Sequence, residues 1–215
     1  AVSDQWDADP HLLNTEGGIV NLLDGSVSEH DPAKYMTRIV RCAPEKDCPR
    51  WMEFLVEVTA GDYDLIAFLQ RVVGYALTGY VREHALFFFY GTGRNGKGVF
   101  LNSLVSMLGE YAGVASIEAL MESHGDRHPT ELADLQGKRL IIAQEVEEGG
   151  KWAESRIKTL TGGDPITARK MRQDFFTFEP QFKLLIAGNH KPAFKSIDEA
   201  LRSRLHLIPF TVTIP

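Results

Sequence analysis

An apolar strand that runs into a glycine-rich turn and a lysine constrains this chain more than any other feature. Residues 86–90 read Leu-Phe-Phe-Phe-Tyr, and three glycines follow before Lys97. Apolar residues three and four apart then indicate a helix. The spacing Gly91-x4-Gly96-Lys97 matches the phosphate-binding loop that joins a strand to a helix. Further strands alternating with helices predict an α/β fold with a mostly parallel central sheet.

The glycines of this loop have a physical reason. A loop that wraps a phosphate turns its N–H groups inward, and glycine reaches the required positive φ angles without strain. The following helix directs its positive end at the same anion, and Lys97 would neutralise the β- and γ-phosphates of ATP. A glycine-rich turn with a chance lysine is the alternative. The residues expected to hold the nucleotide are Gly91, Thr92, Gly93, Arg94, Asn95, Gly96, Lys97, Gly98 and Val99.

Gly98 departs from the usual pattern of this loop. A serine or threonine normally stands after the lysine and offers its hydroxyl to Mg²⁺. Either water or another side chain replaces that ligand here, or the metal binds weakly.

Two further strand ends carry polar residues. Glu145 and Glu147 follow an apolar run, and residues two apart on a strand face the same side, so both are candidates to hold Mg²⁺. Glu145 is the preferred catalytic acid, and an ordinary acidic turn is the alternative. Asn189 closes another apolar strand and could orient water against the γ-phosphate, although an ordinary turn explains it equally well alone.

The remaining chain shows where other elements are expected. Turn-forming residues fill positions 1–50, with short strands predicted at 18–23 and 36–42. Helices are predicted from Pro49 and after a cap at Asp62. Residues 165–180 indicate a hairpin with a basic tip. We therefore predict an N-terminal region at 1–80, of small strands and then helices, and an ATPase domain at 81–215.

Composition narrows the class of protein. The chain is 44% hydrophobic with a net charge of −6, which favours a packed core and argues against a general polyanion binder. Cys42 and Cys48 have no cysteine or histidine partners at metal-ligand spacing and are interpreted as free thiols. No apolar run approaches the roughly 18 to 20 residues that cross a bilayer. We expect a cytoplasmic protein without membrane contact.

In combination and in this order, the motifs resemble a known family. The segments "FFFYGTGRNGKGVF", "RLIIAQEVEE", "LTGGDPITAR", "GNHKP" and "LRSRLHLIPF" are similar to the superfamily 3 helicase domain of phage, plasmid and poxvirus-type primase-helicases. The preceding residues resemble the segment before that domain in the same family. The resemblance implies a P-loop AAA+-like core, with Lys97, Glu145 and Asn189 as Walker A lysine, Walker B acid and sensor.

The family also implies partners. The resemblance implies that ATP and Mg²⁺ bind between the subunits of a ring, expected to be a hexamer, and that single-stranded DNA threads the channel. The hairpin residues Arg169, Lys170 and Arg172 could contact DNA phosphates there, or simply form a solvated hairpin end. Arg204, with Arg202 as the alternative, could reach the ATP of a neighbouring subunit. A primase domain would lie elsewhere on the parent polypeptide.

Two other functions remain open. An assembly or loader ATPase would bind ATP and oligomerise without unwinding DNA. A small-molecule kinase would share the phosphate loop, but the basic hairpin and the strand-terminal Asn189 argue against it.

Overall fold

The computed structural model describes residues 5–117, 130–144, 152–190, 194 and 198–214. The elements, in chain order, are β1 (Leu12–Thr15), β2 (Gly18–Asn21), β3 (Val27–Ser28), η2 (Pro32–Lys34), α1 (Pro49–Val58), α2 (Tyr63–Leu77), β4 (Leu86–Tyr90), α3 (Lys97–Leu108), η3 (Gly109–Tyr111), β5 (Ala112–Val114), α4 (Thr130–Ala133), β6 (Leu140–Gln144), α5 (Glu154–Gly162), β7 (Ile166–Arg169), β8 (Phe175–Phe178), β9 (Lys183–Gly188), α6 (Glu199–Arg204) and β10 (Leu205–Pro209).

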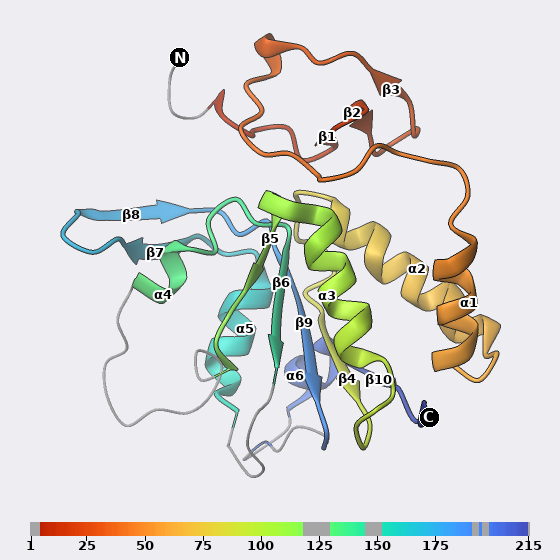
Figure 1. Cartoon of the computed structure of the whole chain (residues 1–215). Helices are drawn as coiled ribbons and strands as arrows, with labels where there is room; N and C mark the ends of the chain where they lie inside the picture. The colour runs from red at the N-terminus through yellow and green to blue at the C-terminus, as the bar shows by residue number, and fades with distance from the viewer. Residues whose placement is uncertain (1–4, 118–129, 145–151, 191–193, 195–197, 215) are drawn as a thin grey trace.

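Five strands form the central sheet in the order β10-β4-β9-β6-β5, and every pairing in it is parallel (Figure 1). The carboxyl ends of β4, β9 and β6 therefore share one edge of the sheet. In an open parallel sheet, ligands bind at this edge. The strand order thus brings together three segments that are far apart in the sequence.

Helices cover both faces of this sheet, and β4 shows why. Phe87 and Phe89 face a core built with α1, α2 and α3, whereas Leu86 and Phe88 face a second core built with α5, β7 and β8. The alternation follows from the two-residue period of a strand. A strand with apolar residues on both faces is typical of a parallel sheet between two helical layers.

Helix boundaries follow local rules. Pro49 occupies the first turn of α1, where its missing N–H costs no hydrogen bond. Asp62 caps α2, and its carboxylate accepts a hydrogen bond of 3.0 Å from the N–H of Leu65. Gly109 ends α3 at a φ of +54°. The predicted helix starts at Pro49 and Asp62 are therefore confirmed.

The N-terminal unit, residues 5–47, contains a three-stranded antiparallel sheet in the order β1-β2-β3. The strand predicted at 18–23 corresponds to β2, but the strand predicted at 36–42 is wrong. The N–H groups of this segment bond to scattered partners: Ile39 to the Glu110 carboxylate, Val40 to the Asn14 carbonyl and Arg41 to the Met107 carbonyl. The segment docks the unit onto the rest of the molecule and joins no sheet beyond one bridge at Val40.

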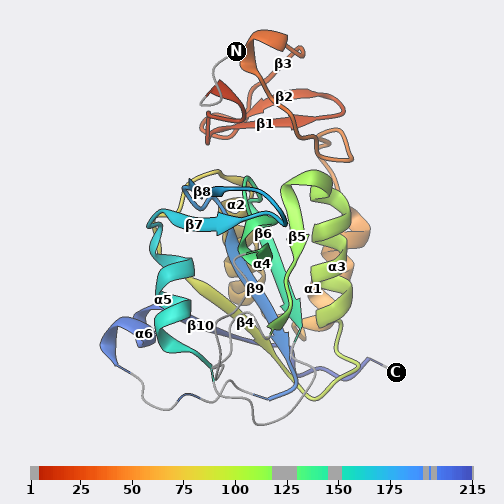
Figure 2. The same ribbon diagram turned by 90° about the vertical axis from the view of Figure 1, so that its left-hand side faces the viewer.

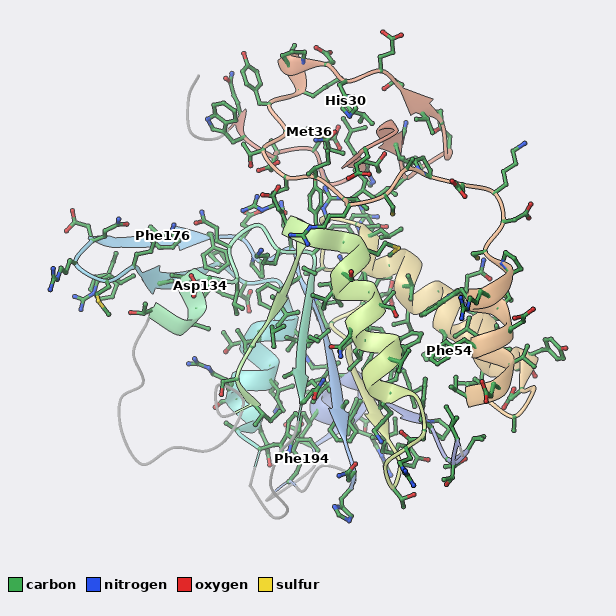
Figure 3. All side chains as sticks on the ribbon, in the orientation of Figure 1. His30, Met36, Phe54, Asp134, Phe176 and Phe194 are labelled. Atoms are coloured by element: carbon green, nitrogen blue, oxygen red, sulfur yellow. The ribbon has the colours of Figure 1, made fainter. Side chains whose placement is uncertain are left out.

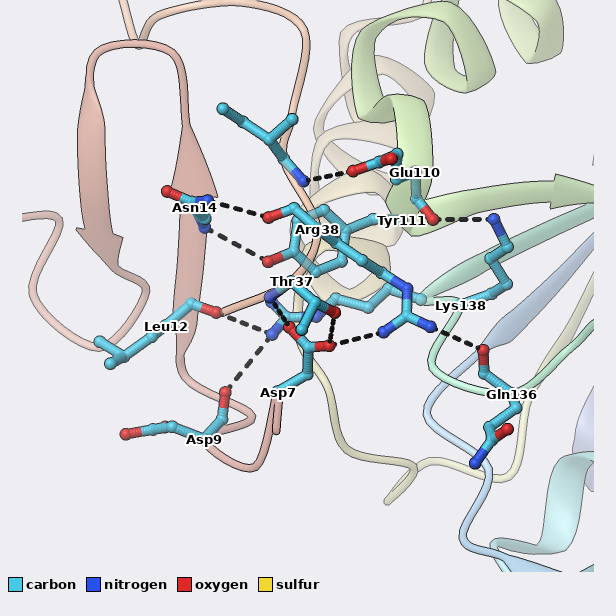
Figure 4. A network of polar contacts seen from close by, with 12 residues as sticks. Asp7, Asp9, Leu12, Asn14, Thr37, Arg38, Glu110, Tyr111, Gln136 and Lys138 are labelled. Atoms are coloured by element: carbon cyan, nitrogen blue, oxygen red, sulfur yellow. Dashed lines mark hydrogen bonds and ion pairs between the residues drawn. The ribbon is translucent and has the colours of Figure 1, made fainter. Parts of the chain in front are cut away.

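Polar contacts fix the N-terminal unit to the central sheet (Figure 4). The Arg38 guanidinium pairs with the Asp7 carboxylate at 2.8 Å and donates to the carbonyl of Gln136 at 3.1 Å. The buried guanidinium of Arg139 donates to the carbonyls of Leu12 and Leu77, each at 2.7 Å. Loops from both parts of the chain are therefore held at the amino-terminal edge of the sheet.

The predicted fold class, an α/β P-loop core of the AAA+-like type after a small mixed N-terminal region, is confirmed. The short edge strand β5 and the helix α4 lie outside the elements predicted from the sequence. The division into domains at residue 80 stays a prediction, and α1 and α2 share a core with β4 and α3.

Candidate nucleotide-binding site

The loop between β4 and α3 needs glycine at two positions. Gly91 has a φ of +154°, and a Cβ there would lie 1.9 Å from the carbonyl oxygen of Phe210. Gly96 has a φ of +83°, and its Cβ would lie 2.5 Å from the side chain of Val58. Both positions combine a positive φ with close approach of another segment. The loop therefore has a defined shape that depends on α1 and on the segment after β10.

Lys97 opens α3 and is only 6% exposed. Its ammonium donates to the carbonyl of Gly91 at 2.6 Å and to the side-chain oxygen of Asn95 at 3.0 Å. Asn95 in turn donates to the carbonyl of Phe210 at 2.7 Å. Burial lowers the pKa of Lys97, because the charged form loses hydration. An anion at this position would restore that lost stabilisation.

A cavity of about 370 Å³ lies against this loop. Residues 93–99 line one side of it, Gln144 comes from the end of β6, and Ala187 to Asn189 come from the end of β9. The first turn of α3 leaves its N–H groups without partners inside the helix, and no described side chain caps it. The cavity thus offers N–H donors, Lys97 and the carboxamides of Asn95, Gln144 and Asn189 to a ligand.

The structure brings most of the predicted nucleotide residues to this cavity. Gly93 to Val99 and Asn189 line the cavity. Gly91 does not line it, but its carbonyl accepts a hydrogen bond from the Lys97 ammonium. Thr92 belongs to the same loop but is exposed and does not line the cavity. Glu145 and Glu147 lie outside the described residues. Gln144, the residue before Glu145, does line the cavity, so the end of β6 reaches the expected edge.

Lack of space does not explain why residue 98 is a glycine and not a serine or threonine. A Cβ added at Gly98 would meet no heavy atom within 4 Å. The position lines the cavity and has room for a serine, a water molecule or a hydrated ion. Among the described residues, no group of three His, Cys, Asp or Glu side chains could hold a metal. The described side-chain carboxamides lining the cavity are those of Gln144, Asn189 and Asn95, and the oxygen of Asn95 already accepts a hydrogen bond from Lys97.

The two candidate arginines of α6 lie away from the cavity. Leu205, which follows Arg204, pairs with Leu86 at the start of β4, whereas the phosphate loop follows the end of that strand. Figure 2 shows α6 and the loop after β4 at opposite ends of this strand pair. Arg204 donates to the carbonyl of Ala200 at 2.7 Å, and Arg202 is exposed. Neither arginine lines the cavity at the loop between β4 and α3 of its own chain.

The basic hairpin is also remote from the cavity. The strands β7 and β8 pair from Ile166 with Phe178 to Arg169 with Phe175, as predicted. The hairpin projects sideways from the central sheet near its amino-terminal edge (Figures 1 and 2). Arg169, Lys170 and Arg172 are all exposed. The structure gathers these three cations at the tip and separates them from the phosphate loop.

Two residues of the site were not identified from the sequence. Gln144 is the polar end of β6 and directly precedes Glu145, so the apolar run before it was an available signal. The carbonyl of Phe210 fixes Asn95 and limits position 91 to glycine. That contact depends on the parallel pairing of β10 with β4, which no local pattern indicates.

A larger cavity of about 550 Å³ lies between α1, α2 and α3. Its lining is mainly apolar, with Cys48, Gln70 and Ser103 as polar members and no charged side chain. A phosphate-bearing ligand needs cations or N–H donors. The smaller cavity at the phosphate loop is therefore the candidate site.

A family model described as a family of unknown function, DUF5906, matches residues 89–204, which is more than half of the chain. The chain belongs to the DUF5906 family. A second model, described as D5 N terminal like, matches residues 1–60 of this DUF5906 chain. The two matches fall within the two segments whose motifs resemble superfamily 3 primase-helicases, and that resemblance is confirmed.

Curated relatives of this DUF5906 chain come from large DNA viruses. A protein of Acanthamoeba polyphaga mimivirus named as a putative helicase is 31% identical over 151 residues, which are 69% of this chain and 16% of the relative. A protein of Frog virus 3 with the same designation is 31% identical over 138 residues, or 61% and 14%. The chain therefore spans about one sixth of the length of these relatives.

Solved structures share the fold. An apo structure of the NrS-1 C-terminal region has a TM-score of 0.61 at 16% identity, covering 96% of this chain and 46% of that chain. A second form gives a TM-score of 0.60 at 17% identity, with 79% and 39% covered. Within the described residues of the DUF5906 chain, no helix has the length and apolar character needed to span a bilayer.

Proposed function

We propose that this chain is the ATP-hydrolysing motor of a replicative DNA helicase of superfamily 3. The observation that carries the proposal is the cavity where the phosphate loop, the end of β6 and Asn189 meet around Lys97. The viral relatives that carry a helicase designation support the same activity.

In this proposal the loop binds the triphosphate of ATP. The free N–H groups of the first turn of α3 hold phosphate oxygens, and Lys97 exchanges the Gly91 carbonyl and Asn95 for the β- and γ-phosphates. Asn189 orients the attacking water, and Glu145 receives its proton. Bound Mg²⁺, held by Glu145 and Glu147 with water at Gly98, would neutralise charge on the phosphates.

The proposal places ATP between the subunits of a ring, which we expect to be a hexamer. Because Arg204 and Arg202 do not line the cavity of their own chain, either would act on a neighbour's γ-phosphate. Mixing Lys97→Ala with Arg204→Ala subunits should then restore some ATP hydrolysis, because one kind of mixed interface is intact. No recovery in assembled rings would contradict a role in trans.

Single-stranded DNA is the proposed partner of the hairpin. Arg169, Lys170 and Arg172 would contact phosphates, which all sequences share. The proposed setting is a cytoplasmic replication complex, with a primase domain on the same parent polypeptide.

The direct test measures ATP hydrolysis and strand displacement on a forked duplex. The chain should hydrolyse ATP faster with single-stranded DNA and displace the strand, whereas Lys97→Ala should do neither. Lys46→Ala, which changes an exposed lysine outside the site, is the control. Hydrolysis without DNA stimulation or displacement would favour an assembly or loader ATPase. Absence of ATP binding by the folded wild-type chain would refute the proposal.

A further inference from the structure

The hairpin tip carries exposed apolar side chains as well as cations. Phe175 is 60% exposed and Met171 is 76% exposed, although both have apolar side chains. Exposed large apolar residues that gather at one place mark a contact surface. Figure 3 shows this hairpin, with Phe176 labelled, extending to one side of the central sheet.

The two faces of the hairpin differ in their contacts. One face lies in the second core of the central sheet, described above. Its residues there are Ile166, Ala168 and Phe178, which are buried, and Phe176, which packs against them. On the opposite face, Thr167 and Thr177 meet at 3.2 Å, and Arg169 stands opposite Phe175. The core anchors the base of the hairpin, so Phe175 is presented outward from a supported strand.

Arg169 orients the ring of Phe175. The centre of its guanidinium lies 5.0 Å from the ring centroid, within the range of a cation–π contact. This contact engages one side of the ring while the side chain stays largely exposed. A planar ligand could therefore stack on the remaining surface without displacing the arginine.

Charge indicates the chemistry of that ligand. The tip carries three cations, Arg169, Lys170 and Arg172, and one carboxylate, Asp174. It is therefore positively charged in a chain whose net charge is −6. A polyanion with planar apolar groups complements both properties. Single-stranded nucleic acid has both, because its phosphates pair with cations and its unpaired bases stack on aromatic rings.

We infer that Phe175, oriented by Arg169, is a base-stacking residue. The hairpin therefore contacts both the bases and the phosphates of single-stranded DNA. The inference rests on the proposed function and deepens it. Phosphate contacts alone lose strength as salt rises, whereas stacking on Phe175 adds a part of the affinity that salt does not screen.

The test compares two oligonucleotides of equal length, one of thymidines and one of abasic sites, by fluorescence anisotropy over a range of salt concentrations. Phe175→Ala should weaken binding of the thymidine strand by about 5- to 150-fold and leave the salt slope unchanged. It should leave binding of the abasic strand unchanged. Phe175→Trp should retain the preference for bases.

Matched variants separate stacking from charge and from folding. Lys170→Ala should weaken both strands alike and reduce the salt slope by about 0.7. Tyr63→Ala removes an equally exposed aromatic ring from the start of α2, 71% exposed, and should change neither strand. Thermal unfolding should be the same for the Phe175 variants and the wild type, because the ring lies outside the core.

The outcomes distinguish the two proposals. If Phe175→Ala leaves both strands unaffected, or weakens both equally, the stacking role is refuted while DNA binding by the hairpin stands. If the wild-type chain binds neither strand at low salt, the proposed function fails and the stacking role fails with it.

Discussion

Two lysines are buried at opposite ends of the central sheet, and their surroundings differ. Lys97 begins α3 at the carboxyl edge and is 6% exposed; Lys183 begins β9 at the amino edge and is 2% exposed. Within the described residues neither forms an ion pair. Both donate to main-chain carbonyls, so burial and hydrogen bonding alone do not separate them.

The difference lies in what surrounds each side-chain nitrogen. Lys183 donates to the carbonyls of Thr78 and Gln181 and lies over the ring of Tyr75 at 4.7 Å. It lines none of the described cavities, whereas Lys97 lines one of about 370 Å³. A buried lysine is therefore a candidate ligand-binding residue when a ligand can replace its hydrogen-bond partners. Lys183 instead connects β9 to the carboxyl-terminal end of α2.

The largest expected effect is on catalysis. Lys97→Ala should lower kcat/KM for ATP by at least about 100-fold, or about 3 kcal/mol, because the phosphates lose their direct cation. Lys183→Met should change it by less than about threefold at a temperature where the variant is folded. Steady-state phosphate release measures both. If the two variants lose activity equally, the distinction between the lysines is wrong.

The second effect concerns the loop that positions Lys97. Gly91→Ala should lower the free energy of unfolding by about 2 to 4 kcal/mol, because its Cβ would overlap the carbonyl of Phe210. Gly93→Ala is the control. Its Cβ meets nothing within 4 Å, so only the strain of a φ of +97°, about 1 kcal/mol, remains. Urea unfolding measures the difference, and equal losses would contradict the close contact.

The third effect is a pH dependence at the other lysine. Burial lowers the pKa of Lys183 from 10.5 to about 6. Between these values the unfolded chain binds a proton that the folded chain does not, so the free energy of unfolding rises with pH above about 6. Below about 6 both states bind the proton and this contribution is constant.

Lys183→Met removes this titration. From pH 6.5 to 8.5 the wild type should gain about 2.5 kcal/mol more stability than Lys183→Met. Urea unfolding at the two pH values measures the gain. Parallel stability curves would show that the ammonium stays charged in the fold.

The smallest effect tests the open position beside Lys97. Gly98→Ser should raise the free energy of unfolding by about 0.5 kcal/mol, because glycine is the poorer helix former. It should also lower the Mg²⁺ concentration for half-maximal hydrolysis by about threefold, since the new hydroxyl is a metal ligand. Gly98→Ala shares the helix effect without the hydroxyl. Identical Mg²⁺ dependence of the two variants would contradict a ligand role.

Local patterns predicted most of the fold. Each strand of the central sheet except β5 contains an apolar run of at least four residues or follows a predicted helix, and caps at Asp62 and Gly109 mark helix ends. The apolar residues of segment 36–42, between turn-forming stretches, predict a strand that the structure does not contain. The N–H groups of this segment instead bond to β1 and to the end of α3, and that docking is decided by contacts distant in sequence.

The sequence by itself determined the phosphate loop, because the glycines of residues 91–96 and Lys97 encode backbone conformation and charge within one turn of chain. Only the tertiary structure decided which residues meet there. The order of strands sets Gln144 and Asn189 beside Lys97, and the pairing of β10 with β4 sets the Phe210 carbonyl behind Asn95. Strand order depends on packing between segments far apart in the chain, and a local sequence pattern therefore does not predict it.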